Sequence, residues 1–150
     1  MPIATNSEKI NISLEVNTSE LAKKFSQKLN RGDVVFLYGE IGVGKTTFVR
    51  YLINNLQIKN NLKLTEVTSP TFNIVNEYEV GKFTIKHYDF FRLSSIQEIK
   101  NIGLLEDNDK SLTLIEWPEK IENLFKNKIS LHFEYGTNIN QRFVTVEGLE

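Results

Sequence analysis

The spacing of apolar and polar residues along the chain predicts strands that alternate with helices. Short apolar runs are typical of buried strands, and strict alternation is typical of half-buried ones. On this basis the predicted strands are residues 10–16, 34–38, 72–80, 82–88, 112–115, 129–135 and 142–146. Gly81 separates the third strand from the fourth, which predicts a hairpin, and the last two strands predict a closing hairpin.

Helical spacing of apolar residues fills several of the segments between these strands. The predicted helices are residues 18–29, 47–57, 96–102 and 118–125. Thr18 or Ser19 can cap the first helix, and Ser94 or Ser95 can cap the third. Strands alternating with helices predict an α/β fold, with a sheet that is mostly parallel at its centre, has antiparallel additions and carries helices on both faces.

Composition narrows the class of protein. A chain of 150 residues is expected to form a single domain, residues 1–150. A net charge of −1 and scattered arginines create no field that attracts nucleic acid, so we expect no direct binding of RNA or DNA. Without cysteine there is no disulfide framework and no thiolate nucleophile. No secretory signal and no apolar run long enough for a membrane span is found, so we expect a cytoplasmic protein.

The most informative segment is GEIGVGKT at residues 39–46, which has the form G-x-x-x-x-G-K-[ST]. Between a strand and a helix, this motif binds phosphate through backbone N–H groups and the amino end of the helix. Lys45 is expected to reach the β- and γ-phosphates, and the Thr46 hydroxyl to hold Mg²⁺. A glycine-rich turn that only joins strand to helix is the alternative. The motif predicts a P-loop NTPase-like three-layer sandwich whose nucleotide-binding residues are Gly39, Glu40, Ile41, Gly42, Val43, Gly44, Lys45, Thr46 and Thr47.

Two acids are candidates for the chemistry, because hydrolysis or transfer also requires carboxylates for Mg²⁺. Glu116 follows the buried run 112–115, at the sheet edge where ligands bind in α/β proteins. An ordinary acid entering the next turn is the alternative. Asp89 is two residues after His87, so both side chains project to one face of a strand. It can hold a metal-bound or catalytic water, or simply cap the turn; a His–Asp transition-metal site lacks a third ligand.

Three further residues have structural and functional interpretations to be weighed. Thr71 follows Pro70, which stiffens the loop, and either meets the γ-phosphate or its Mg²⁺ as a switch threonine does or belongs to an ordinary turn. Trp117 is expected to point to the opposite side of the strand from Glu116, where it packs in the core, shields the site or meets a partner. His132 alternates with apolar neighbours, which favours a structural role.

Four segments together resemble the TsaE family in their order and spacing. They are GEIGVGKTTFVR (39–50), VTSPTFNIVNEY (67–78), HYDFFRL (87–93) and LIEWPE (114–119). The phosphate loop is shared by many families, whereas SPTF, H-x-D-x-x-R-L and EWPE together are specific. The departures are small: Glu40 stands where the family usually has Asp, and Phe91 where it has Tyr, which leaves open any hydrogen bond made there.

The resemblance implies roles for particular residues. It implies that Glu116 takes the Mg²⁺-binding place of a Walker B acid, together with Thr46. Thr71 resembles a switch residue, and the H-x-D acid, Asp89, is a site residue. With Lys45, these make the expected catalytic set Lys45, Thr71, Asp89 and Glu116. A nucleotide contact by Arg142 is also expected, although the last hairpin matches only loosely.

The resemblance also implies a Mg²⁺-dependent ATPase that is slow alone and regulated by partners. TsaE-like proteins bind a complex of TsaD and TsaB, in which TsaD transfers threonylcarbamoyl to adenosine 37 of tRNAs reading ANN codons. ATP hydrolysis is then expected to reset that complex, with tRNA met only indirectly. The implied cofactors are ATP and Mg²⁺.

Two other functions remain open at this point. A small-molecule kinase usually brings arginines to the transferred phosphoryl group, and here only Arg92 is near the expected site in sequence. A nucleotide-gated binding module would bind without turnover. A GTPase is disfavoured, since neither N-K-x-D nor D-x-x-G occurs.

Overall fold

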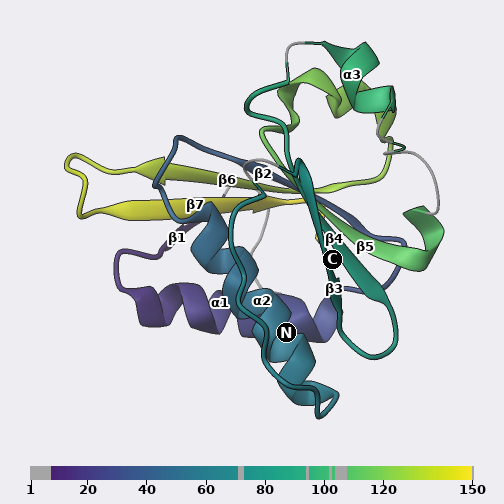
Figure 1. Ribbon diagram of the computed structural model, residues 1–150. Helices are drawn as coiled ribbons and strands as arrows, with labels where there is room; N and C mark the ends of the chain where they lie inside the picture. The colour runs from purple at the N-terminus through teal and green to yellow at the C-terminus, as the bar shows by residue number, and fades with distance from the viewer. Residues whose placement is uncertain (1–7, 71–72, 94, 102, 104–107, 150) are drawn as a thin grey trace.

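The computed structural model describes residues 8–70, 73–93, 95–101, 103 and 108–149 (Figure 1). Its strands are β1 (Lys9–Asn11), β2 (Val34–Tyr38), β3 (Val75–Glu79), β4 (Thr84–Asp89), β5 (Ser111–Glu116), β6 (Ile129–Tyr135) and β7 (Arg142–Glu147). Its helices are α1 (Glu15–Lys28), α2 (Lys45–Lys59) and α3 (Ile96–Asn101), with short 3-10 turns η1 (Asn108–Lys110), η2 (Pro118–Lys120) and η3 (Glu122–Leu124).

In the described part of the chain the strands form one sheet, in the order β1-β7-β6-β2-β5-β4-β3. The four strands at its centre, β6, β2, β5 and β4, pair in parallel. The pairs β3–β4, β6–β7 and β1–β7 are antiparallel. The predicted fold class is therefore confirmed, and so are both predicted hairpins.

The helices α1 and α2 cover one face of the sheet (Figure 1). Alternate residues of the central strands, such as Leu37 of β2 and Leu114 of β5, enter the core on this side. The rings of Phe25 in α1 and Phe48 in α2 meet edge to face, with centroids 5.3 Å apart. In α2 the buried positions recur at helical spacing, which makes one continuous apolar stripe against the sheet.

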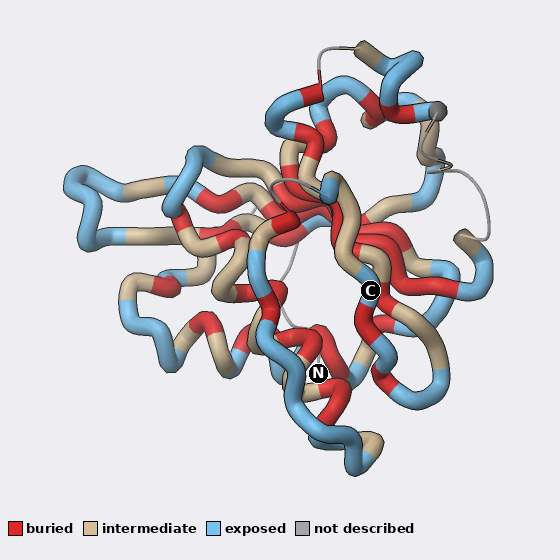
Figure 2. The backbone as a smooth tube through the Cα atoms, in the orientation of Figure 1, coloured by how far each residue is buried: buried red, intermediate tan, exposed pale blue. Residues whose placement is uncertain are grey.

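The opposite face is covered by shorter elements. Phe36 of β2, Tyr88 of β4 and Ile115 of β5 form a second cluster with Ile99 of α3 and with Ile121, which lies between η2 and η3. Figure 2 shows the buried residues concentrated along the central strands, between these two layers. The sheet is thus covered on both faces, as the sequence predicted, but by long helices on one side only.

The first predicted strand and helix need correction. The strand ends at Asn11 rather than continuing to residue 16, and α1 begins at Glu15. The Asn11 side chain accepts a hydrogen bond from the Ser13 backbone at 2.9 Å, which turns the chain. Consequently Thr18 is not a cap; it is buried in α1, and the cap position Leu14 makes no side-chain cap bond.

The predicted helix 118–125 is also wrong. The segment forms the two 3-10 turns η2 and η3 instead, separated by Ile121 at φ −121° and ψ 8°. Because Ile121 is fully buried in the second cluster, packing and not helical propensity decides the conformation here. For α3, the Ser95 hydroxyl accepts the Glu98 N–H at 3.3 Å, so one of the two predicted caps is found; Ser94 lies outside the described residues.

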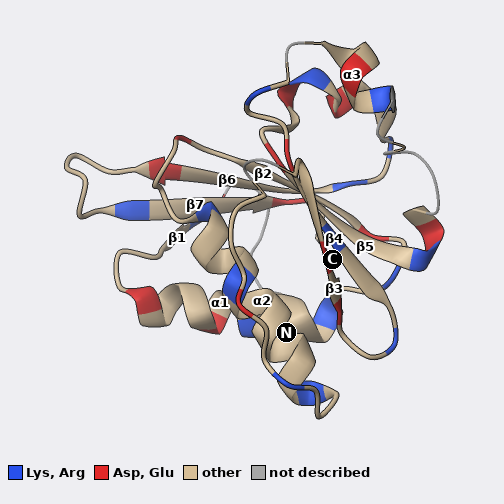
Figure 3. Cartoon of the chain, viewed as in Figure 1, with Lys and Arg blue, Asp and Glu red and all other residues tan. Residues whose placement is uncertain are grey.

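Acidic and basic residues are distributed over the helices and most strands, whereas β2 contains none (Figure 3). Among the described residues, no helix has the length and apolar character needed to cross a membrane.

Candidate functional site

The phosphate loop joins β2 to α2 through backbone that favours glycine. Gly39 has φ 144°, and a Cβ there would lie 2.8 Å from the Phe133 carbonyl oxygen. Gly44 has φ 119° and is the N-cap of α2. A Cβ on Gly44 would meet no atom within 4 Å, so the space beside it is open.

The amino end of α2 is suited to binding an anion. No side chain caps it, and its first turn contains no acidic residue. Its first N–H groups therefore lack an intrahelical partner and carry the positive end of the helix dipole. The local sequence thus fits phosphate, the ligand that such helix ends bind in proteins.

A cavity of about 400 Å³ lies beside this loop, and we call it the loop cavity. Its lining residues come from the loop and α2 and from the ends of β4 and β5: Ile41, Gly42, Gly44, Lys45, Thr46, Thr47, Ser69, Asp89, Phe91, Arg92, Glu116 and Trp117. The structure therefore brings Lys45, Asp89 and Glu116 of the expected catalytic set together with five further expected nucleotide- or metal-binding residues, which are Ile41, Gly42, Gly44, Thr46 and Thr47.

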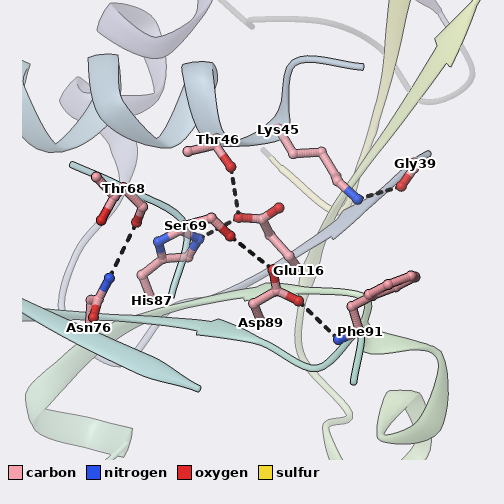
Figure 4. Close-up of polar contacts among 10 residues, drawn as sticks. All are labelled: Gly39, Lys45, Thr46, Thr68, Ser69, Asn76, His87, Asp89, Phe91 and Glu116. Carbon is pink, nitrogen blue, oxygen red and sulfur yellow. Dashed lines mark hydrogen bonds and ion pairs between the residues drawn. The ribbon is translucent and has the colours of Figure 1, made fainter. Parts of the chain in front are cut away.

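Glu116 is the buried acid of the loop cavity. It ends β5, is 3% exposed, and is the register neighbour of Asp89 on β4 and of Leu37 on β2. The Thr46 hydroxyl donates to its Oε2 at 3.4 Å (Figure 4). The same Oε2 lies 2.6 Å from Nε2 of the buried His87. Two contacts from two different elements hold this carboxylate.

Asp89 is the more exposed acid. Its Oδ1 accepts the Phe91 backbone N–H at 2.9 Å, which caps the turn after β4. Its Oδ2 accepts the Ser69 hydroxyl at 3.0 Å. The capping role that the sequence left open is therefore present, and the second oxygen of the same side chain is bound by Ser69, which with Asp89 lines the loop cavity.

Ser69 belongs to the segment that carries the predicted switch residue. Asn76 of β3 donates to the Thr68 carbonyl at 3.3 Å, which ties this segment to β3. Thr71 itself lies outside the described residues, so its role stays a prediction.

Lys45 is folded back onto its own loop. Its Nζ donates to the Gly39 carbonyl and lies 4.0 Å from the centre of the Trp117 ring. Burial lowers the pKa of Lys45 below its ordinary 10.5, and the charges of Glu116 and Asp89 partly oppose that shift. The ammonium group is thus held inside the site by the loop carbonyl and an aromatic face.

Trp117 differs from its prediction. It has φ 57° and ψ 58°, a left-handed backbone that ends the alternation of β5 and brings the ring into the loop cavity instead of to the opposite side. The Phe91 ring packs on it with centroids 4.8 Å apart. Sequence spacing could not reveal this, because alternation holds only while the strand continues.

A second cavity of about 490 Å³, the α1 cavity, adjoins the loop on its other side. It shares Gly44 and Thr47 with the loop cavity and is also lined by Val43 and Arg142. Arg142 is thus near the phosphate loop but in this second cavity. Val43 also lines the α1 cavity, although its side chain is fully buried. Glu40, in the same loop, is exposed.

The residues present fit a magnesium ion held jointly with phosphate. In the described ranges, no group of three or more His, Cys, Asp or Glu side chains gathers as a metal site. The Thr46 hydroxyl and the Glu116 carboxylate are oxygen donors, which Mg²⁺ prefers, and Mg²⁺ typically takes few protein ligands beside phosphate and water.

Comparison with known proteins gives a consistent result. The family model described as "Threonylcarbamoyl adenosine biosynthesis protein TsaE" matches residues 12–144. A protein named tRNA threonylcarbamoyladenosine biosynthesis protein TsaE from Rickettsia felis is 43% identical over 110 residues, which cover 73% of this chain and 62% of that protein. Its namesake from Aquifex aeolicus is 37% identical, over 71% of this chain and 73% of that one. The crystal structure of Bacillus subtilis YdiB has a TM-score of 0.74, covering 95% of this chain and 86% of that one, at 24% identity.

Proposed function

The chain belongs to the TsaE family, and from that premise we propose that it binds and hydrolyses ATP in the threonylcarbamoylation of adenosine 37 in tRNAs reading ANN codons. The observation that carries the proposal is the loop cavity, where an uncapped helix end, Lys45, Thr46 and Glu116 converge. The matched segment spans 62% of the Rickettsia felis protein, so that protein's full activity is part of the proposal and not a premise.

Each residue of the loop cavity has a role in this proposal. The backbone of residues 39–44 and the first turn of α2 bind the phosphates. Lys45 leaves the Gly39 carbonyl and pairs with phosphate oxygens, which compensates the burial of its charge. Thr46 and Glu116 would hold Mg²⁺, which when bound would supply positive charge beside the phosphates. Asp89 lines the cavity beside Ser69, and we assign to it the orientation of the attacking water.

The α1 cavity suits the nucleoside part of ATP. It meets the loop at Gly44 and Thr47, and it is large enough for a sugar and a base. Arg142 and Arg50 line it, and their planar guanidinium groups can stack on an adenine ring. This assigns to Arg142 the nucleotide contact expected from the resemblance.

The partners are proposed on the family resemblance, with support from the rim of the loop cavity. Ile41 and Phe91 are 68% and 52% exposed there, although both are large apolar residues. A protein that covers bound ATP would remove this apolar surface from water. We assign this role to the complex of TsaD and TsaB, with residues 1–150 acting as a single ATPase domain in the cytoplasm, and with ATP hydrolysis resetting the complex.

A matched pair of variants at the two ends of α2 tests this function. Lys45→Ala removes the phosphate contact, whereas Lys59→Ala changes an exposed lysine at the far end of the same helix. ATP binding and phosphate release are measured with and without TsaD and TsaB, and threonylcarbamoyladenosine is measured in tRNA hydrolysates. We expect slow phosphate release from the chain alone, a changed rate with the partners, and loss of both rate and modified tRNA in Lys45→Ala only.

Three results would count against the proposal in different ways. Equal ATP binding by wild type and Lys45→Ala would refute the phosphate site. Hydrolysis by the chain alone at full rate, unchanged when TsaD and TsaB are added, would refute the partner-regulated role. If ATP promotes the complex with TsaD and TsaB but is not consumed, the protein is a nucleotide-gated binding module and not an ATPase.

A further inference from the structure

His87 is a polar residue in an apolar layer. It lies in β4 with 0% exposure, on the face of the sheet that α1 and α2 cover. Ile85, two residues before it on the same face, is a fully buried core residue, and so is Leu114, its register partner on β5. Burying an imidazole among such neighbours costs free energy unless its nitrogen atoms are hydrogen-bonded. A specific contact must therefore explain why histidine occurs here.

That contact is made to Glu116 alone among the described residues. Nε2 of His87 lies 2.6 Å from Oε2 of Glu116 (Figure 4). A carboxylate that serves as a metal ligand accepts hydrogen bonds, and in that arrangement Nε2 carries the hydrogen and donates it. Nδ1, by contrast, is buried and has no hydrogen-bond partner in the part of the chain that the structure describes. The side chain is therefore arranged for one bond, and that bond is to the site acid.

The bond fixes where the Glu116 carboxylate lies. Glutamate has three side-chain torsions, and without a partner on the β4 side its carboxylate could turn away from α2. The donor from His87 and the donor from Thr46 meet at the same oxygen, at 2.6 Å and 3.4 Å. The shorter of the two comes from the sheet.

We propose that His87 is a positioning residue that holds the Glu116 carboxylate beside the Thr46 hydroxyl, so that the two oxygen donors are arranged for Mg²⁺ before nucleotide binds. The proposal rests on the nucleotide and Mg²⁺ site proposed above. Histidine acts here through Glu116 and touches neither ATP nor metal. Comparable hydrogen-bond partners of metal ligands change metal affinity about 10–100-fold when removed.

The test measures ADP affinity with Mg²⁺ and with EDTA, by calorimetry, in the intact chain. Gln places an amide N–H near the position of Nε2, Asn places one near Nδ1, and Phe keeps the ring without a donor. We expect His87→Phe and His87→Asn to leave the ADP affinity measured in EDTA within about twofold of wild type. In both variants, the Mg²⁺ concentration that gives half of the Mg²⁺-induced increase in ADP affinity should rise about tenfold. His87→Gln is expected to restore that concentration to within about threefold of wild type.

Two comparisons separate positioning from a merely structural role. Thr113→Val changes another fully buried polar residue, on the opposite face of β5, and is expected to leave the Mg²⁺ requirement unchanged. In a Glu116→Ala background, His87→Phe is expected to cause no further change, because its effect passes through the carboxylate. Thermal unfolding of each variant identifies any that does not fold. If His87→Phe does not fold, the comparison of His87→Gln with His87→Asn tests the positioning role.

The results distinguish this proposal from the function itself. If wild type does not bind ADP, or if Mg²⁺ does not affect its binding, the proposed nucleotide site is refuted before any variant is made. If Mg²⁺ raises the ADP affinity of wild type, and His87→Phe and His87→Asn need the same Mg²⁺ concentration as wild type, the positioning role is overturned while the nucleotide site stands. An equal shift in Gln and Asn would also overturn it.

Discussion

The ends of β5 and β4 place two acids side by side, yet in different surroundings. Glu116 and Asp89 are register neighbours on parallel strands. Glu116 is 3% exposed and is bound by the side chains of His87 and Thr46. Asp89 is more exposed and is bound by a backbone N–H and by Ser69, which belongs to a connecting segment.

The difference indicates different tasks for two chemically similar groups. Partners from a strand and a helix hold Glu116, so it can keep one position and serve a metal ion. A partner on a loop holds Asp89, so its position depends on that loop. We therefore assign the metal to the β5 acid and the orientation of water to the β4 acid.

The largest effect is expected at the β5 acid. Glu116→Ala removes the carboxylate that we propose holds Mg²⁺ with Thr46, so we expect ATP hydrolysis to fall about 100-fold or more. Phosphate release under saturating ATP measures this, with Glu116→Gln as the variant of nearly equal shape. Hydrolysis that remains within threefold of wild type in both variants would remove Glu116 from the site.

A smaller effect is expected at the β4 acid. Asp89→Asn keeps the size of the side chain and weakens its ability to orient water, so we expect hydrolysis to fall about tenfold. ADP binding with Mg²⁺ is expected to stay within about threefold of wild type, since we assign the metal to Glu116. If instead Mg²⁺-dependent binding were lost in Asp89→Asn and kept in Glu116→Ala, the two assignments would have to be exchanged.

The loop contact to Asp89 is expected to matter less still. Ser69→Ala removes one hydrogen bond to the carboxylate, so hydrolysis should fall about threefold without a change in the Mg²⁺ requirement. Ser69→Thr retains the hydroxyl and serves as control. An effect of Ser69→Ala as large as that of Asp89→Asn would show that the serine has a task of its own.

The smallest effect concerns the charge of Lys45 without nucleotide. Burial lowers the pKa of Lys45, and Glu116 opposes this more than Asp89 does. Because the unfolded chain then binds the proton more tightly, the charged lysine destabilises the fold at neutral pH, and this cost disappears as pH rises towards 10.5. Lys45→Met should therefore be the more stable protein at neutral pH, with the gap closing at higher pH.

The two acids modulate this gap unequally. Urea denaturation from pH 7 to 10 should show a larger gain from Lys45→Met in a Glu116→Gln background than in an Asp89→Asn background. The reverse order would contradict the view that Glu116 is the nearer electrostatic partner. Equal free energies of unfolding for wild type and Lys45→Met at neutral pH would mean that burial does not destabilise the charged lysine.

Much of this site could be predicted from the sequence, because short-range patterns determine it. The buried runs of β2 and β5 and the loop between β2 and α2 are legible in residue type and spacing. So are the places of Glu116 and Asp89, which follow from the rule that parallel strands end at one edge. The hairpins follow from Gly81 and from alternation in the last two strands.

The remainder depends on contacts between distant residues. His87 is 29 residues from Glu116, and only the register of β4 with β5 brings them together. Trp117 turns into the site because its backbone is left-handed, which no spacing rule anticipates for tryptophan. Alternation also misled at Leu14, which is 65% exposed: the pattern extended past the end of β1 into the start of α1.

The central claim is that the β5 acid, and not the β4 acid, holds the metal of the nucleotide site. Electron paramagnetic resonance of Mn²⁺, which substitutes for Mg²⁺, measures the bound ion directly in the presence of ADP. We expect wild type and Asp89→Asn to bind about one Mn²⁺ per nucleotide with similar affinity, and Glu116→Ala to bind it about tenfold more weakly or worse. Equal Mn²⁺ affinity in Glu116→Ala and wild type would contradict the account.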